Sequence, residues 1–234
     1  TNYLNYNIIY LFIIMKILGF IPARGGSKSI PLKNLYNINN KPLIYYTLKN
    51  AIDSKIFYKI IVSSDNNKIL DYSGKFKKID LVKRPKNISG NSSLTEEALE
   101  HALKSLKKNL PDYICIIEPT APLRSIKTLK KLKKFLKRKK IISLITTNKI
   151  DHIPGKINNN TYNYLEYNRK PRQQRKPYYL ETGTFYVVNY NYFIKSKRIV
   201  CIKPYAFNVP KIESMDINDL EDLKIAEALI KNLK

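Results

Sequence analysis

The segment "KILGFIPARGGSKSIPLKN", residues 16 to 34, begins the pattern that the rest of the chain repeats. Its apolar run at 16–21 predicts a buried strand, and a short loop with two adjacent glycines follows directly. Glycines allow backbone N–H groups to approach an anion, and Arg24 and Lys28 add positive charge. The spacing is neither that of a P-loop nor that of a dinucleotide-binding loop. Taken alone, the loop fits either an anion site or an ordinary turn.

Apolar runs rich in β-branched residues alternate with amphipathic patterns along the chain. We expect further strands at 59–64, 78–82, 112–118, 141–147, 183–188 and 199–203. We expect helices at 42–54, 94–108, 125–140 and 219–232. Alternation of this kind predicts an α/β fold, with a mostly parallel sheet covered by helices.

Two of these helices have a local start signal. Pro42 lies near the first turn of its helix, where a missing N–H has no consequence. Ser93 and Glu96 have the S-x-x-E spacing of a capping box, and apolar residues then recur on one helix face. His101 falls inside that helix, so we expect it to be structural.

Residues 146–179 break the alternation. This segment contains prolines and asparagines and shows no sustained period, and irregular segments of this length are usually functional. We therefore expect a core formed by residues 16–145 and 180–232, with 146–179 as an excursion from it.

The chain is strongly basic, with 43 Lys and Arg against 18 Asp and Glu and a net charge of +25. Such a balance favours a polyanionic partner. The cations are nevertheless spread along a sequence that is also rich in Asn, Ile and Tyr and lacks Trp, a composition typical of an AT-rich genome. We therefore expect a small anionic substrate, and neither nucleic acid nor a membrane as partner. The basic helix at 125–140 is interpreted as a solvated outer helix, with a membrane or RNA surface as the alternative.

Cysteine usage and the start of the chain indicate the compartment. Cys115 and Cys201 lie in apolar runs, which is typical of thiols in a reducing compartment. The apolar stretch at 8–14 is too short to span a bilayer and lacks the flanks of a signal peptide. Because the first methionine is Met15, we expect residues 1–14 to be an extension outside the domain and the protein to be cytoplasmic.

Polar residues follow several predicted strands, and ligands of α/β sheets bind beyond the carboxyl ends of the strands. Asp65 and Glu118 lie at such ends, and Asp216 lies just before the last helix. Together with the basic loop they would suit a triphosphate and Mg²⁺. Each position also has a structural alternative. Asp65 could cap a helix, Glu118 could pair with Arg124, and Asn218 could cap the last helix.

Eight motifs occur in one order along the chain: "IPARGGSKSIPLKNL", "NNKPLIYYTLKNAI", "IIVSSDNNKIL", "RPKNISGNSSLTEEALEHAL", "EPTAPLR", "PRQQRKP", "ETGTFYV" and "MDINDLEDLKIAE". In this order they resemble the acylneuraminate cytidylyltransferases, the CMP-sialic acid synthetases, over residues 16 to 229. The resemblance implies a Rossmann-like nucleotidyltransferase with three α/β/α layers, acting as a homodimer with Mg²⁺. It further implies transfer of CMP from CTP to the anomeric hydroxyl of a nine-carbon keto sugar acid, with release of pyrophosphate.

The resemblance also implies roles for the residues that match the family's motifs. Those implied to bind CTP are Arg24, Ser27, Lys28, Lys33 and Asn34, with Arg84, Ser93 and Thr95 at the positions that read cytosine. Those implied to contact the sugar acid are Glu118, Lys156 and Arg172, the last two in the segment that crosses to a partner subunit. Those implied for catalysis are Arg24 and Lys28 as charged donors and Asp216 as the metal ligand.

Three positions depart from the family pattern. Glu118 stands where the family usually has Gln, and Asn218 and Asn91 stand where it has Asp. These departures leave the acceptor open. An acetylneuraminate or legionaminate type is favoured, pseudaminate or the eight-carbon sugar Kdo is the alternative, and a catalytically degenerate nucleotide or RNA binder is the alternative from another class.

Overall fold

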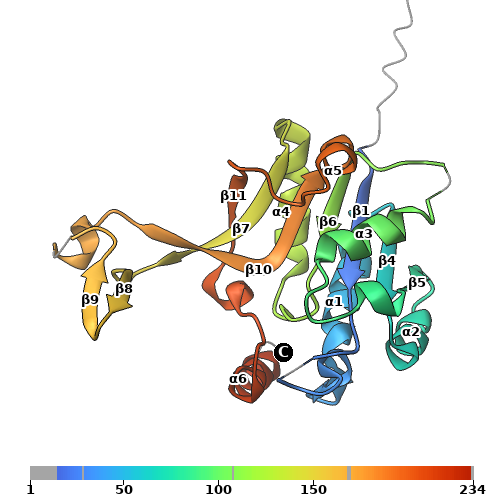
Figure 1. Ribbon diagram of the computed structural model, residues 1–234, viewed down its shortest axis with the longest axis horizontal. Helices are drawn as coiled ribbons and strands as arrows, with labels where there is room; N and C mark the ends of the chain where they lie inside the picture. The colour runs from blue at the N-terminus through green and yellow to red at the C-terminus, as the bar shows by residue number, and fades with distance from the viewer. Residues whose placement is uncertain (1–14, 28, 107, 168–169, 233–234) are drawn as a thin grey trace, which may run out of the picture.

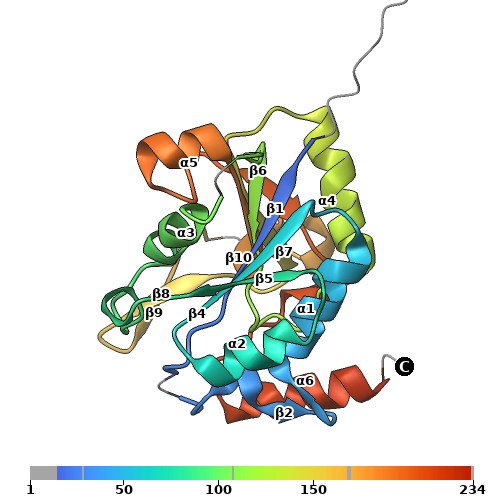
Figure 2. The same cartoon turned by 90° about the vertical axis from the view of Figure 1, so that its right-hand side faces the viewer.

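The fold was analysed in a computed structural model that describes residues 15–27, 29–106, 108–167 and 170–232. The predicted extension at 1–14 and the predicted phosphate ligand Lys28 lie outside the described residues. The fold is a three-layer α/β/α sandwich around a seven-stranded sheet (Figure 1, Figure 2), as the sequence predicts.

The sheet has the order β11-β7-β10-β6-β1-β4-β5 and is mixed. Neighbours are parallel except where β10 runs antiparallel to both β6 and β7. The strands are β1 Ile17–Pro22, β4 Lys59–Ser64, β5 Ile79–Lys83, β6 Tyr113–Ile116, β7 Ser143–Ile150, β10 Tyr178–Asn189 and β11 Tyr205–Asn208. Two small antiparallel pairs stand apart from it, β2 Asn37–Ile38 with β3 Lys41–Pro42 and β8 Gly155–Asn158 with β9 Thr161–Tyr164.

Helices cover both faces of the sheet because the central strand β1 is apolar on both sides. Its Ile17 and Ile21 join a core with α1 and α4, whereas Leu18 and Phe20 join a second core with α3 and α5. All four side chains are fully buried. The helices are α1 Leu43–Ser54, α2 Asn67–Gly74, α3 Thr95–Leu103, α4 Ile126–Arg138, α5 Tyr190–Ser196 and α6 Leu220–Asn232.

The expected strand at 199–203 is wrong. The strand in this region is β11, and α5 precedes it. The Cys201 N–H donates to the Ser143 hydroxyl at 2.9 Å, which is a side-chain acceptor rather than a strand partner. The apolar run therefore forms a loop, in which Ile199 is buried and Ile202 is 90% exposed.

The expected capping box of Ser93 and Glu96 is also wrong, because the observed box lies one residue later, at Leu94 and Glu97. The helix begins at Thr95, and the Leu94 N–H donates to the Glu97 carboxylate at 2.9 Å. The Ser93 hydroxyl instead accepts from a backbone amide of the preceding turn. The sequence pattern therefore located the helix but not its cap, and the helix ends five residues earlier than the expected end at 108.

The segment at 146–179 contains regular structure. Strands β7 and β10 run on past the body of the sheet, and the hairpin β8–β9 lies at their far end (Figure 1). We call β8, β9 and the connection to β10, residues 155–177, the arm. The division into core and excursion stays a prediction.

The largest fully buried side chain is that of Arg124, in the loop between β6 and α4. Its guanidinium donates to the Thr184 carbonyl at 2.7 Å, to the Glu118 carbonyl at 2.8 Å and to the Thr47 hydroxyl at 3.4 Å. Burial lowers the pKa of this guanidinium to about 10. The three acceptors come from β10, from the end of β6 and from α1, so one cation joins three elements that surround the carboxyl ends of the central strands.

We expect Arg124→Leu to lower the free energy of unfolding by about 3 kcal/mol or more, because two buried carbonyls would lose their donor. Arg138→Leu, at the exposed end of α4, is the matched control and should change it by no more than about 0.5 kcal/mol. Equilibrium urea denaturation measures both variants. Equal, small effects would contradict the role of Arg124.

Candidate nucleotidyltransferase site

Two cavities adjoin at the carboxyl ends of β1, β5 and β6. The smaller has a volume of about 240 Å³ and is lined by Pro22, Arg24, Arg84, Asn91, Ser93, Leu94, Thr95 and Glu118. The larger has a volume of about 460 Å³ and is lined by Thr95, Glu96, Ile116, Glu118, Thr120, Glu181, Gly183, Tyr186, Ile199, Val200 and Asp216. Thr95 and Glu118 line both, so the two cavities share a wall.

The smaller cavity brings together most of the residues that the resemblance implies for CTP. Arg84 is buried and donates to the hydroxyl and the carbonyl of Ser63, at 3.1 and 2.9 Å. Burial lowers the pKa of this guanidinium, and Asp65 opposes the shift. Arg24 also lines the cavity and donates to the Gly90 carbonyl at 3.0 Å. Two cations therefore line this space.

The glycine loop is held by its neighbours. The Gly25 N–H donates to the Asp65 carboxylate at 2.8 Å, and a Cβ on Gly25 would lie 2.7 Å from the Asn66 Cβ, so only glycine fits there. The Asn34 amide donates to the Arg24 carbonyl at 2.9 Å. The helix-cap alternative for Asp65 is wrong, because Asn66 caps α2. Asn34 and Asp65 thus hold the glycine loop in place, and Ser27, within this loop, is half-buried.

Lys33 connects this loop to the segment that carries Asp216. Its ammonium donates to the carbonyls of Ile217 and Asn218, at 2.8 and 3.0 Å. Burial lowers the pKa of Lys33, and the nearby Asp216 opposes this shift.

The cap of α6 is Asp219 and not Asn218. The Asp219 carboxylate accepts from the N–H groups of Glu221 and Asp222, at 2.9 and 3.0 Å. The alternative reading of Asn218 as the helix cap is therefore wrong.

Asp216 fits the role of a metal ligand. One of its carboxylate oxygens, Oδ1, is buried without a hydrogen-bond partner among the described residues. Gly183, in the irregular part of β10, lies beside it, and a Cβ there would come within 3.7 Å of the carboxylate. A buried carboxylate oxygen without a donor suits a hard cation such as Mg²⁺.

Glu118 lies in the shared wall of the two cavities. The alternative of an ion pair between Glu118 and Arg124 is wrong, since the guanidinium donates to the backbone carbonyl of Glu118 and not to its carboxylate. Burial, and then the charge of Asp216, raise the pKa of the Glu118 carboxyl to about 7, against the opposing effect of Arg124 and Arg84. Because its pKa is about 7, this carboxyl gains or loses its charge near neutral pH, at the position where the two cavities meet.

Several cavity residues were not predicted as site residues. Glu181 and Tyr186 lie on β10 and line the larger cavity. Glu96, on α3, and Thr120, in the loop after β6, line the same cavity. Burial and the neighbouring Glu181 raise the pKa of the Tyr186 hydroxyl. Glu181 and Tyr186 both belong to the quoted motif "ETGTFYV", which was the available signal.

Lys156 and Arg172 are not brought to these cavities within one chain. Both belong to the arm, which points away from the body of the sheet (Figure 1). Arg172 pairs with Asp151 at the base of the arm. Their predicted contact with the sugar acid requires a second chain.

A cavity lined by two arginines adjoins a larger acidic cavity through a shared wall at the carboxyl ends of the central strands, an arrangement that suits transfer of a nucleotidyl group on a Rossmann-like fold. The chain belongs to the cytidylyltransferase family, whose model matches residues 18–231. It is a nucleotidyltransferase, as the sequence predicts.

Known relatives agree with this assignment. The chain is 32% identical over 228 residues to the pseudaminic acid cytidylyltransferase of Campylobacter jejuni subsp. jejuni serotype O:23/36 (strain 81-176), covering 93% of this chain and 97% of the relative. It is 26% identical over 221 residues to the N-acylneuraminate cytidylyltransferase of Escherichia coli O18:K1:H7 (strain RS218 / NMEC), covering 90% of this chain and 51% of the relative. The chain thus spans about half the length of that second relative.

Among solved structures, CMP:2-keto-3-deoxy-manno-octonic acid synthetase complexed with CTP is similar, with a TM-score of 0.70. The match covers 94% of this chain and 100% of that chain at 15% identity, so it concerns the fold alone.

Glu118 gives a pH-dependent prediction. Its pKa in the fold, about 7, lies above the ordinary 4.5, so its ionisation lowers stability as the pH rises through this window. Glu118→Gln removes that loss. We expect the stability gained by this variant to be larger at pH 8 than at pH 5, by about 1 to 3 kcal/mol.

Urea denaturation with EDTA present measures this difference without bound metal. Asp71→Asn, on the exposed face of α2, is the control and should show the same small effect at both pH values. A gain for Glu118→Gln that does not change between pH 5 and pH 8 would contradict the raised pKa.

Proposed function

We propose that the protein transfers CMP from CTP to the anomeric hydroxyl of a nonulosonic acid and releases pyrophosphate. The observation that carries this proposal is the shared wall of the two cavities, at Thr95 and Glu118. A nucleotide in the smaller cavity and a sugar acid in the larger one would bring the α-phosphate and the hydroxyl together at this wall. The proposal places the reaction in the cytoplasm, where CTP is found.

The residues of the smaller cavity would hold the nucleotide. Arg84, Ser93, Thr95 and Arg24 all line this cavity; the first three would contact cytosine and Arg24 would contact the phosphates. Lys28 and Lys33 belong to the same loop and would add charge. Placed cations of this kind stabilise the charge that develops during phosphoryl transfer.

The reaction is an in-line displacement. The anomeric oxygen forms a bond to the α-phosphorus, and the bond from that phosphorus to the bridging oxygen breaks, leaving pyrophosphate. The hydroxyl proton would pass to a carboxylate, for which we propose Glu118, since it lines both cavities. Mg²⁺, when held by Asp216, would neutralise phosphate charge.

The acceptor is of the nonulosonic class. The relative that matches along almost its full length acts, by its name, on pseudaminic acid, whereas the N-acylneuraminate relative is less similar. The Glu118 carboxyl in place of the usual Gln is a further difference at the sugar side. We therefore propose pseudaminate first and acetylneuraminate or legionaminate second.

The arm supports a homodimer with completed sites. It exposes apolar side chains, with Ile157 72%, Leu165 61% and Tyr167 76% accessible. The described lining of the larger cavity contains no Lys or Arg, although its substrate carries a carboxylate. We propose that Lys156 and Arg172 of a second copy supply this charge.

We expect CTP-dependent pyrophosphate release with a nonulosonic acid, and its loss when EDTA removes divalent metal. Arg24→Ala should lower the turnover by about a hundredfold, because one charged donor to the phosphates is removed. Lys224→Ala, exposed on α6, should leave it unchanged. A panel of pseudaminate, acetylneuraminate, legionaminate and Kdo measures the acceptor. CTP binding without turnover on any of them would contradict the proposal.

The dimer predicts that two inactive variants rescue each other. When Arg24→Ala and Arg172→Ala chains are co-expressed, half of the dimers are mixed and each has one intact site, so about a quarter of the wild-type activity should return. Arg24→Ala with Asp216→Asn is the control, because both changes lie in the core and no intact site can form. Equal activity of the two mixtures would exclude a shared site.

A further inference from the structure

The edge of the sheet opposite the two cavities is densely basic. It lies at the amino ends of the parallel strands, where α3 and α4 end and α5 begins (Figure 1, Figure 2). We call the basic edge the exposed residues Lys104, Lys108, Lys137, Arg138, Lys139, Lys140, Lys195 and Lys203. They come from three separate parts of the chain, those that lead from α3 to β6, from α4 to β7 and from α5 to β11.

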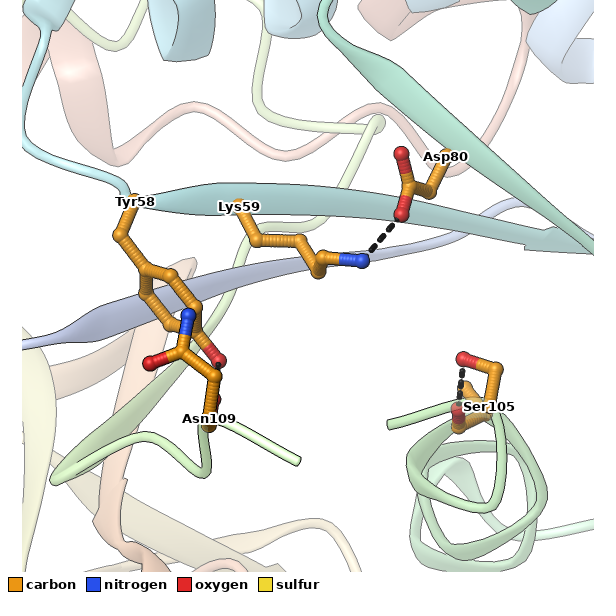
Figure 3. A network of polar contacts seen from close by, with 6 residues as sticks. Tyr58, Lys59, Asp80, Ser105 and Asn109 are labelled. Carbon is orange, nitrogen blue, oxygen red and sulfur yellow. Dashed lines mark hydrogen bonds and ion pairs between the residues drawn. The ribbon is translucent and has the colours of Figure 1, made fainter. Parts of the chain in front are cut away.

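The acidic residues at this edge are already engaged. Glu100 pairs with Lys197 at 2.8 Å, and Asp80 pairs with Lys59 (Figure 3). The Asp112 carboxylate accepts from the Lys16 N–H at 2.7 Å. Residues 137–140 form no ion pair within the described part of the chain. The edge therefore presents a positive field, while carboxylates gather in the larger cavity at the other end.

Aliphatic side chains project among these cations. Leu110 is 48% exposed, Ile142 53% and Ile202 90%. The contact between Ser143 and Cys201 holds the last two close together. The Tyr58 hydroxyl donates to the Asn109 carbonyl at 2.9 Å and so fixes the loop that carries Leu110 (Figure 3).

The helix α4, which ends at the basic edge, is not free to insert into a bilayer. The apolar face of α4, with Leu129, Leu132 and Leu136, is buried against the sheet. Within the described ranges, no helix is long and apolar enough to cross a membrane. Any contact with a bilayer would be at its surface, through cations and a few aliphatic side chains.

We propose that the basic edge docks on an anionic lipid bilayer. Lysines and arginines near such a surface bind its negative potential, and aliphatic side chains among them enter the boundary layer. A nucleic-acid surface would favour aromatic rings for base stacking, whereas the most exposed large apolar side chain here, Ile202, is aliphatic. This proposal replaces the expectation of no membrane partner and of a merely solvated helix at 125–140.

The test is co-sedimentation of the full chain with vesicles of three parts phosphatidylcholine and one part phosphatidylglycerol, at about 0.1 M salt. Lys139→Glu with Lys140→Glu should lower the partition coefficient about tenfold or more. Lys224→Glu with Lys231→Glu, which makes the same charge change on exposed positions of α6, should lower it far less. Ile142→Ser with Ile202→Ser should make the remaining binding more sensitive to salt. CTP turnover shows that each variant is folded.

The same paired substitutions are also made in a chain that begins at Met15. There they measure vesicle binding by the basic edge without the apolar sequence at 8–14. A difference between the two charge-reversal variants in both chains supports the proposal. Three results would overturn it: equal losses for the two variants, equal binding to vesicles of phosphatidylcholine alone, or binding to mixed-sequence RNA with no binding to anionic vesicles.

Discussion

The buried guanidinium of Arg124 is the interaction on which the site depends. A buried charge is costly unless hydrogen bonds satisfy it, so its acceptors must stay in place. They come from α1, from Glu118 at the end of β6 and from Thr184 in the irregular part of β10. The same stretch of β10 places Gly183 against Asp216. One structural cation thereby fixes the position of the shared cavity wall.

The local pattern predicted what local physics determines. The strand at 16–21 and the four expected helices follow from the apolar period and are confirmed, apart from the early end of α3, whereas the three layers were implied by the family resemblance. The run at 199–203 has the composition of a strand but lies in a loop, because the Cys201 N–H donates to the side-chain hydroxyl of Ser143, which is far away in sequence. The capping error at Ser93 is a local one: the Ser93 hydroxyl accepts from the Gly90 N–H, and the box closes one residue later, between the Leu94 N–H and the Glu97 carboxylate.

The site was partly predictable for a related reason. The ordered motifs indicated Arg24, Arg84, Ser93, Thr95, Glu118 and Asp216, and the structure brings these six to the two cavities. Their individual roles stay predictions. Glu181 and Tyr186 escaped because they face the cavity only through the antiparallel pairing of β10 with its neighbours. The separation of charge between acidic cavity and basic edge also needs the topology, since along the sequence the two kinds of residue are interleaved.

The most direct test of the account is a crystal structure with the CMP-sugar product bound. The account predicts cytosine beside Arg84 and Ser93, the phosphate at the wall formed by Thr95 and Glu118, and the sugar in the larger cavity against Glu181 and Tyr186. It also predicts a side chain from the arm of a second copy at the sugar carboxylate. A nucleotide bound elsewhere, for example in the lysine-lined groove beside Lys55 and Lys78, would contradict it.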